Sequence, residues 1–397
     1  MRRIAPLIFY CIVLALFAAF ALRTPKMGTW DILPYIANAE ALRNNDFIHL
    51  HRYAYAQLKQ HTPSTNFADL TQSSEYRRKT AADPVLFGTG LQFYSIRPLY
   101  IMALRLGVAL GANPVRSAGL IAALSYFLSG LVVFLWLRAH TPAWLAVVAS
   151  LLLMLSYPVL LDGRLYTPDA MAAFAMLCSA YLIFERERVL PGLVILLAGI
   201  FVRTDVCVFV GFTLLAMTLA DSPRTRLTRL QAAVLICVAA ASVLAINHFA
   251  GNYGYASLMH NQFVGESDPP DAPYSVTPAL YRRALASNSG MPAALHGYIF
   301  IFLLIALLAA IRKRTAMRDL AFVALLTAAT HFVFFPYFHD RLFVGEYLLF
   351  AVTAVATLNV PFARALRPEH GSVSQLAPLE IASIDPKREV SDHPKSA

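Results

Sequence analysis

Two aspartates lie at junctions between apolar and polar sequence, where each could take part in proton transfer. Asp31 lies in MGTWDILPYIANAEAL, shortly after the apolar stretch 4–22, and Asp169 lies in LLDGRLYTPDAMAAF, where another stretch begins. A carboxylate near a hydroxyl group can act as a general base. A second carboxylate can orient an acceptor or hold a divalent cation, so dependence on a divalent cation stays open.

Each aspartate also has a purely structural interpretation. Asp31, which follows Gly-Thr-Trp, could be a helix N-cap, a position that aspartate favours. Asp169 could stabilise a helix start through the helix dipole, and Asp162 could pair with Arg164 in the same loop. If a helix begins at Asp31, Tyr35 shares its face at i+4 and becomes a candidate contact for a sugar or an acceptor.

Three arginines at the edges of apolar stretches could bind an anion. Arg97 begins RPLY, Arg203 lies in FVRTDVCVF, and Arg341 lies in FPYFHDRLFVGEYLLF. Arginine binds phosphate through a planar fork of N–H donors. These three side chains are therefore candidates for binding a lipid phosphate.

The arginines also have alternatives, and the remaining motifs are few. Each could extend along a membrane surface or pair with Asp205 or Asp340. Tyr347, which follows Arg341, is a second candidate for contact with a sugar or an acceptor. The sequence has no HExxH, no GxGxxG and no Walker loop. A sugar nucleotide or ATP is therefore not an expected substrate.

The elements that must position these side chains are membrane spans. Of the 397 residues, 58% are hydrophobic and 14% are charged, against about 25% charged in ordinary globular domains. Such a chain lacks the polar surface of a soluble protein, and its four cysteines lie in apolar stretches without metal-ligand spacing. The composition argues against a soluble enzyme, a disordered protein and a disulfide scaffold.

The apolar stretches predict an all-α polytopic membrane protein with about ten transmembrane helices. Met1-Arg2-Arg3 before the first stretch resembles a signal peptide, but the stretch is long and favours an uncleaved helix with a cytoplasmic N-terminus. The predicted spans are 4–22, 117–137, 142–158, 167–184, 189–202, 206–220, 231–249, 294–311, 319–335 and 342–360.

The segment 97–111 decides the orientation of every later loop. It is apolar but short, and Arg105 lies in its middle. If it lies flat at the outer surface, the inner loops hold 14 basic residues and the short outer loops hold 5. Counting it as a span places the basic loops 221–230 and 312–319 outside, against the positive-inside rule. We therefore expect an interfacial helix at 97–111.

This topology predicts one transmembrane domain, 1–366, with two large outer loops at 23–116 and 250–293. The polar segment 367–397 is expected to be a disordered cytoplasmic tail. The net charge of +10 fits cationic inner loops. No basic-aromatic binding module is present, so nucleic acid is not an expected partner.

The order of these motifs resembles the GT-C superfamily of membrane glycosyltransferases, in the branch of protein O-mannosyltransferases and aminoarabinose transferases. WDILPY with Asp31, RPLY with Arg97, GRLYTPDAMAAF with Asp169 and DRLFVGEYLLF with Arg341 are similar to motifs of that family. The resemblance covers about residues 1–360. Ile32 stands where the family often has glutamate, and Arg97 where lysine is commoner, so acceptor class and metal dependence stay open.

The resemblance implies transfer of a sugar from a polyprenyl-phosphate donor to a glycan, lipid or protein acceptor outside the cytoplasm, usually with inversion. Asp31 is then the expected general base, and Asp169 orients the acceptor or supports a cation. Arg97, Arg341 and Arg203 are expected to neutralise the departing phosphate. The expected location is a bacterial inner membrane. The alternative is a transporter or flippase of a lipid-linked sugar, which would share the phosphate site but not the chemistry.

Overall fold

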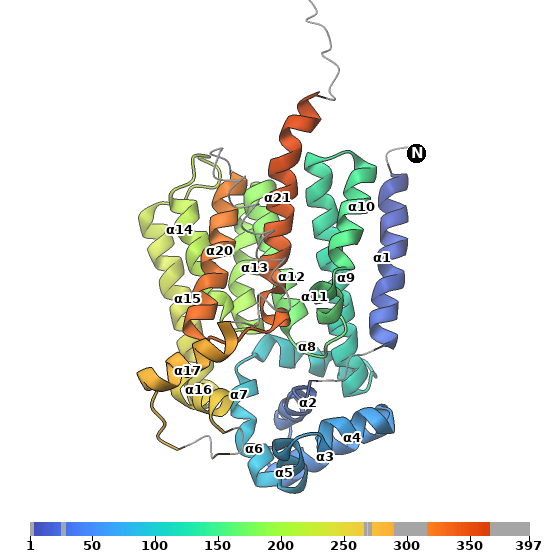
Figure 1. The fold of residues 1–397 in the computed structure, drawn as a ribbon, viewed down its shortest axis with the longest axis vertical. Helices are drawn as coiled ribbons and strands as arrows, with labels where there is room; N and C mark the ends of the chain where they lie inside the picture. Colours follow the sequence, from blue (N-terminus) through green and yellow to red (C-terminus); the bar gives the residue numbers. More distant parts are fainter. Residues whose placement is uncertain (1–3, 25–28, 266–267, 269–271, 290–315, 366–397) are drawn as a thin grey trace, which may run out of the picture.

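The computed structural model describes residues 4–24, 29–265, 268, 272–289 and 316–365. Every secondary-structure element in these ranges is a helix, which confirms the all-α fold class. Long helices run side by side as a bundle, and shorter helices gather at one end of it (Figure 1). The predicted span 294–311 and the predicted tail 367–397 lie outside the described residues.

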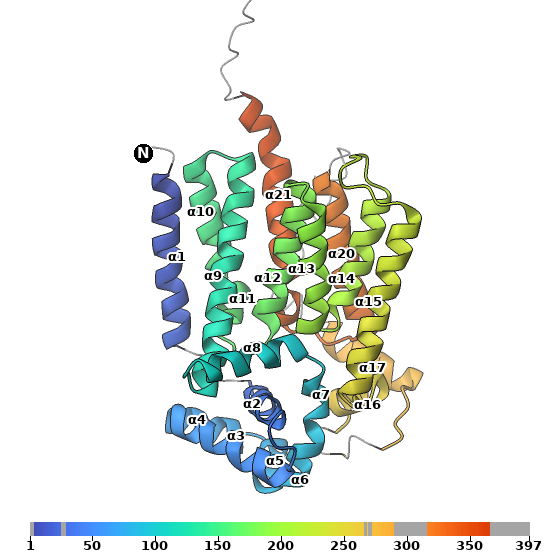
Figure 2. The ribbon, with the colours of Figure 1, turned by 180° about the vertical axis from the view of Figure 1, so that it is seen from behind.

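The bundle contains the helices that correspond to the predicted spans. It consists of α1 (Ala5–Arg23), α9 (Pro114–His140), α10 (Ala143–Met154), α12 (Asp169–Ala180), α13 (Val189–Val202), α14 (Val206–Thr218), α15 (Arg229–Phe249), α20 (Ala316–Phe334) and α21 (Val344–Ala365). The views from the front and from behind show these helices running in the same general direction (Figures 1 and 2).

Several bundle helices have the length and composition of membrane spans. Helices α1, α9, α15 and α20 are each long and apolar enough to cross a bilayer. Helices α10, α13 and α14 are apolar but shorter, with 12, 14 and 13 residues. At a rise of about 1.5 Å per residue, these three are shorter than a hydrocarbon core of about 30 Å. The long apolar helices indicate a membrane protein.

Two predicted spans are not regular α-helices along their whole length in the structure. The stretch 142–158 is divided into α10 and the short helix α11 (Tyr157–Asp162). The backbone leaves helical geometry at Ser156 (φ −58°, ψ 144°), and Pro158 lies in the first turn of α11, where its missing N–H costs no intrahelical hydrogen bond. The stretch 167–184 begins as α12 and ends in a π-helical turn, η1 (Tyr181–Glu185).

The predicted outer loop 23–116 forms a layer of helices that we call the cap. It contains α2 (Ile32–Ala41), α3 (Phe47–His61), α4 (Ser64–Gln72), α5 (Glu75–Ala82), α6 (Pro84–Gly90), α7 (Gln92–Ser95) and α8 (Pro98–Ala109). Local sequence sets several boundaries, because the side chains of Asp46, Ser74 and Asp83 accept hydrogen bonds from backbone N–H groups at the starts of α3, α5 and α6.

Helix α8 corresponds to the segment expected at the membrane surface. It runs across the end of the bundle rather than along it (Figures 1 and 2). Tyr100, Ile101 and Leu104 are buried against the rest of the protein, whereas Met102 and Leu106 are exposed. An exposed apolar face is what a helix lying in a membrane surface requires.

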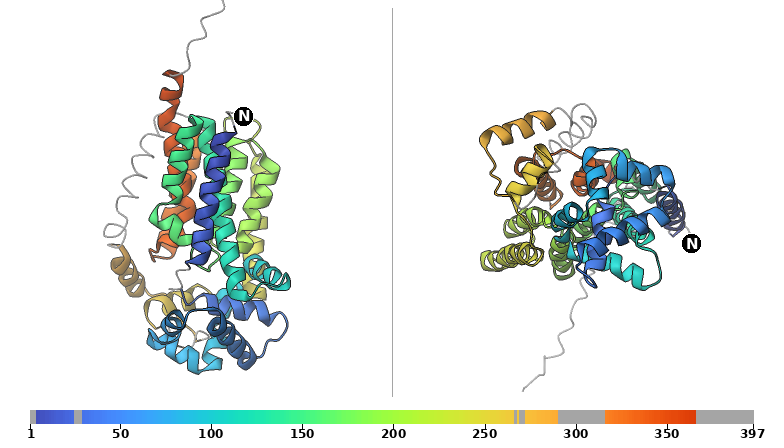
Figure 3. Two further views of the ribbon diagram at one scale, coloured as in Figure 1. Left: turned by 90° about the vertical axis from the view of Figure 1, so that its right-hand side faces the viewer. Right: turned by 90° about the horizontal axis from the view of Figure 1, so that it is seen from below.

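The second predicted outer loop lies at the same end as the cap. It contains α16 (Tyr255–Phe263) and α17 (Pro278–Ser289), and the view from below shows them beside the cap (Figure 3). The hydroxyls of Ser95 and Tyr253 donate hydrogen bonds between the two regions, to the carbonyl oxygens of Ala250 and Thr89, each at 3.1 Å. The described start of α1 and the end of α21 lie at the opposite end of the bundle.

The apolar core has two parts, one in the bundle and one in the cap. Trp136, Phe209 and Phe350 belong to the bundle core, and Leu33 and Phe87 belong to the cap core. At the boundary between the two cores, charged side chains can be buried without being surrounded by apolar side chains alone. The candidate site lies at this boundary.

Candidate functional site

A cleft of about 530 Å³ lies where the end of the bundle meets the cap and α16. Its lining includes four of the residues singled out from the sequence, together with Asp205 and His331. The charged and titratable lining residues used below are Asp31, Arg97, Arg203, Asp205, His331 and Arg341. Asp31 and Arg97 come from the cap, and the other four come from the bundle and its connections. Residues that are distant in sequence therefore form one polar surface.

Asp31 and Arg341 form the central ion pair of the cleft. Nη1 of Arg341 donates a hydrogen bond to Oδ2 of Asp31 at 2.6 Å, and the Tyr94 hydroxyl donates to Oδ1 at 3.1 Å. Asp31 precedes α2, but its side chain makes no capping hydrogen bond. The N-cap interpretation of Asp31 is therefore wrong for this side chain, because its oxygens face the cleft residues instead.

The surroundings of Asp31 also change its acidity. Burial would raise the pKa of this carboxyl group, but the charge and hydrogen bond of Arg341, with Arg97 nearby, outweigh burial and hold its pKa below the usual value. In this state Asp31 is an ionised but weak base. Loss of the contact with Arg341 would strengthen it as a proton acceptor.

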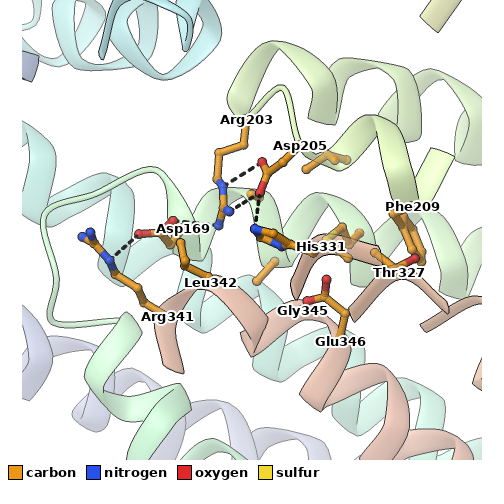
Figure 4. Close-up of a pocket in the computed structure, with 14 residues that line it drawn as sticks. Asp169, Arg203, Asp205, Phe209, Thr327, His331, Arg341, Leu342, Gly345 and Glu346 are labelled. Atoms are coloured by element: carbon orange, nitrogen blue, oxygen red, sulfur yellow. Dashed lines mark hydrogen bonds and ion pairs between the residues drawn. The ribbon is translucent and has the colours of Figure 1, made fainter. Parts of the chain in front are cut away.

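Asp169 lies behind the cleft surface and links two of the arginines (Figure 4). It is 5% exposed. Nη1 of Arg203 donates to its Oδ1 at 2.7 Å, and Nε of Arg341 lies 3.7 Å from its Oδ2. The Thr167 hydroxyl donates to Oδ2 at 2.7 Å. Asp169 is in the first turn of α12, as the helix-dipole interpretation requires, but these contacts also make it a positioning group for both guanidinium groups.

Arg203, Asp205 and His331 form a second polar group on the bundle side (Figure 4). Arg203 donates to both oxygens of Asp205, through Nε at 3.1 Å and through Nη2. Nε2 of His331 lies 3.5 Å from Oδ2 of Asp205. The alternative that Arg203 pairs with Asp205 is confirmed, and Arg203 contacts Asp169 in addition.

Arg97 belongs to the cleft but makes a different set of contacts. It donates to the carbonyl oxygen of Phe93 at 3.0 Å, and its guanidinium carbon lies 5.6 Å from the ring centroids of both Tyr35 and Tyr94. These are cation–π contacts. The charge of Arg97 is thus held close to Asp31 by aromatic rings.

The two tyrosines proposed as sugar or acceptor contacts lie away from the cleft surface. Tyr35 is 2% exposed and packs edge-on against Tyr94 and Tyr100. Tyr347 packs against the bundle core. Neither is among the described residues that line the cleft. Tyr35 therefore supports Arg97 from behind, and direct contact of either tyrosine with a ligand stays a prediction.

Asp162 and Arg164 do not form the pair that their spacing allowed. Nε of Arg164 donates instead to the carbonyl oxygen of Thr24 at 2.7 Å. Asp162 is 2% exposed, and burial together with the nearby charge of Asp169 raises its pKa well above the usual value. These surroundings favour the neutral form of Asp162 over its charged form.

The sequence analysis did not identify His331 and Glu346, although their positions within apolar stretches could have indicated them. Both lie within stretches predicted as spans, and ionisable residues in such stretches often mark functional sites. Glu346 is 4% exposed and lines a small cavity of about 20 Å³ behind the cleft, together with Asp169 and Arg203. No comparable pattern points to Tyr94, since its contact with Asp31 depends on how the cap folds.

The described residues include no group of three or more His, Cys, Asp or Glu side chains placed to hold a metal ion. The carboxylates of the cleft are instead paired with arginines. Comparisons with protein-family models, curated proteins and solved structures find no match to this chain. The argument for function therefore depends on the geometry of the cleft.

Proposed function

We propose that the protein is a membrane glycosyltransferase that moves a sugar from a polyprenyl-phosphate donor to an acceptor hydroxyl. The observation that carries this proposal is the cleft that gathers Asp31 with Arg97, Arg203 and Arg341. Sugar transfer from a lipid phosphate needs a base for the acceptor and fixed positive charge for the departing phosphate. The cleft offers both kinds of group.

The wall of the cleft beside the arginines is suited to an amphipathic donor. Phe334 and Tyr255, at the bundle end and on α16, are 65% and 45% exposed, and Leu258 is 37% exposed. All three line the cleft with the arginines. A donor phosphate would bind the guanidinium groups through charge-assisted hydrogen bonds, while its polyprenyl chain would cover the apolar side chains.

Arg341 links donor binding to the state of the base. In the structure it is bound to Asp31 at 2.6 Å. A phosphate that shares the Arg341 fork weakens this pair, and its negative charge raises the pKa of Asp31. The acceptor oxygen then attacks the anomeric carbon as Asp31 takes the hydroxyl proton. The bond between that carbon and the phosphate oxygen breaks, and its electron pair stays with the phosphate, beside Arg97 and Arg203.

The proposal includes a specific membrane arrangement. About ten spans place the cleft, the cap and α16–α17 on the outer face, with 221–230 on the cytoplasmic side. The apolar helices and the exposed face of α8 support this arrangement. A bacterial inner membrane is the proposed location.

The experiment is an assay of the purified protein in nanodiscs with polyprenyl-phosphate sugars and candidate hydroxyl acceptors. Consumption of the lipid-linked sugar with formation of a glycosylated acceptor is expected. A matched protein with Asp31→Asn should bind the donor and leave it intact. Equal consumption by both proteins would overturn the assignment of Asp31.

The same preparation distinguishes the enzyme from a transporter of lipid-linked sugars. In vesicles, a transporter would move the donor across the bilayer and leave the bond between sugar and phosphate unbroken. Transport without cleavage, in the presence of an acceptor mixture, would replace the glycosyltransferase proposal with the transporter alternative.

A further inference from the structure

The cleft and its immediate surroundings contain more acidic groups than permanent cations. The carboxyl groups are those of Asp31, Asp162, Asp169, Asp205 and Glu346. The guanidinium groups are those of Arg97, Arg203 and Arg341, together with Arg77, whose Nη1 lies 3.5 Å from Oδ2 of Asp69. Arg77 has Asp69 as a partner, and the other three arginines are matched in number by Asp31, Asp169 and Asp205. A phosphate that enters adds negative charge to a site with no spare cation among these groups.

A negative charge added to an enclosed site is costly unless another charge compensates it. Each carboxylate that loses its guanidinium partner to the phosphate would stay buried and unpaired. A proton taken up from the solvent can supply the compensating positive charge. Histidine is the side chain that ordinarily gains a proton near neutral pH.

His331 is placed to hold this proton. Its Nε2 lies 3.5 Å from Oδ2 of Asp205, and its side chain is 12% exposed at the cleft. Its ring packs on Phe343 with centroids 5.1 Å apart. Protonation would turn the contact with Asp205 into an ion pair that does not need Arg203.

The charged groups around His331 come from each described element near this part of α20. Asp205 and Arg203 lie on the connection between α13 and α14, and Asp169 lies on α12. Arg341 lies on η2 (Asp340–Phe343), and Glu346 lies on α21. Burial opposes a charged ring, but three of these five groups are carboxyls. A phosphate that engages the two arginines would therefore shift the balance toward a cationic ring.

We propose that binding of a phosphodiester anion in the cleft is coupled to uptake of one proton, which the His331–Asp205 pair holds. The phosphate draws the Arg203 fork from Asp205, and a proton from the solvent binds a ring nitrogen of His331. The imidazolium then replaces the guanidinium as the partner of Asp205. His331 is thus a positioning residue for the donor, and the inference rests on the proposed function.

The probe should carry the lipid and the phosphate but no reactive sugar and no titration of its own. Polyprenyl methyl phosphate fits, because a phosphodiester has no second ionisation, whereas a phosphate monoester titrates near pH 6. Calorimetry in buffers with different ionisation enthalpies counts the protons taken up. A chelator present throughout ensures that the compensating charge is not a trace metal ion.

For the wild-type protein, we expect uptake that approaches one proton and an affinity that falls up to about tenfold per pH unit above neutrality. His331→Gln should abolish the uptake and flatten the pH dependence. Asp205→Asn should also flatten it and bind the probe more tightly at alkaline pH, because a negative charge is removed. If Asp205 served only folding, Asp205→Asn would not bind the probe more tightly than the wild-type protein at alkaline pH.

The matched control is His260→Gln. His260 also pairs with an aspartate, Asp268 at 2.8 Å, but does not line the cleft as described. This variant should keep the wild-type proton uptake. Binding of the probe without proton uptake, or uptake that persists in both His331→Gln and Asp205→Asn, would overturn the inference and leave the proposed function standing. Absence of any binding by the wild-type protein would overturn the donor site itself.

Discussion

The carboxylate of Asp31 is held by partners from two distant parts of the chain. Tyr94 donates to one oxygen from the cap, and Arg341 donates to the other from the connection before the last described helix. An ordinary aspartate at a helix start would instead accept hydrogen bonds from the first backbone N–H groups. The side chain of Asp31 makes no such bond, so both of its oxygens are held by the cleft residues.

Asp31→Asn is expected to reduce sugar transfer by about 10²–10⁴-fold, because the amide cannot accept the acceptor proton. Binding of the lipid donor should be retained. The measurements are turnover, donor affinity and thermal stability in nanodiscs. Asp46→Asn is the matched control, since Asp46 does cap a helix by accepting from the N–H of His49 and asparagine caps equally well. Wild-type turnover in a stable Asp31→Asn protein would refute the role of Asp31.

Arg341→Ala is expected to weaken donor binding more than Arg341→Lys, because lysine keeps the charge but lacks the fork. Arg341 is 17% exposed and contacts Asp31 and Asp169. Its removal should also reduce the free energy of unfolding, on the order of 3 kcal/mol, because Asp31 loses its guanidinium partner and Asp169 keeps only Arg203. Thermal unfolding and donor titration measure the two effects. Exposed Arg116 provides the control, and Arg116→Ala should leave both unchanged.

At the scale of elements, α8 combines a buried face with an apolar exposed one. Met102, Leu106 and Leu110 are 62%, 60% and 80% exposed, and they recur at the i, i+4 spacing of one helix face. A fluorescent label on a cysteine at Leu106 is expected to be quenched by lipids brominated near the headgroup. The same label at Lys59, exposed on α3 of the cap, should stay unquenched. Equal signals at both sites would contradict the interfacial position of α8.

Several elements could be predicted from the sequence because the deciding information is local. Apolar length predicted α1, α9 and α15, and the helix expected at 97–111 corresponds to α8, whose position at a membrane surface stays a prediction. The break between α10 and α11 was missed, since the apolar stretch continues through it and hydropathy does not register backbone geometry. The seven helices of the cap could not be predicted individually, because short amphipathic helices gain their stability from tertiary contacts.

Part of the candidate site could also be predicted from local sequence. Asp31, Arg97, Arg203 and Arg341 were identified because charge is costly near apolar stretches, and all four line one cleft. Their pairing could not be predicted, because no periodicity specifies contacts across hundreds of residues. The way the cap meets the bundle decides which arginine contacts Asp31. It also decides that Asp169 lies behind the cleft surface.

For the whole molecule, the positions of the connections predict the sides of the membrane. The α14–α15 connection lies at the end opposite the cap, and α17 lies near the cap (Figure 1). In a background without the four native cysteines, single cysteines at Thr228 and Ala286, both exposed, should react from opposite sides. An impermeant reagent added outside intact cells should label Ala286→Cys alone. Labelling of both from outside would refute the topology.

The Asp31–Arg341 ion pair joins residues 310 positions apart, which has a consequence for biosynthesis. Asp31 leaves the ribosome early, while its guanidinium partner is made only after α20. Until then, enclosing Asp31 would leave its buried carboxylate without this cation, which is costly. The cap is therefore expected to stay apart from the bundle during synthesis and to dock once the segment around Arg341 has emerged, so that the cleft is completed near the end of translation.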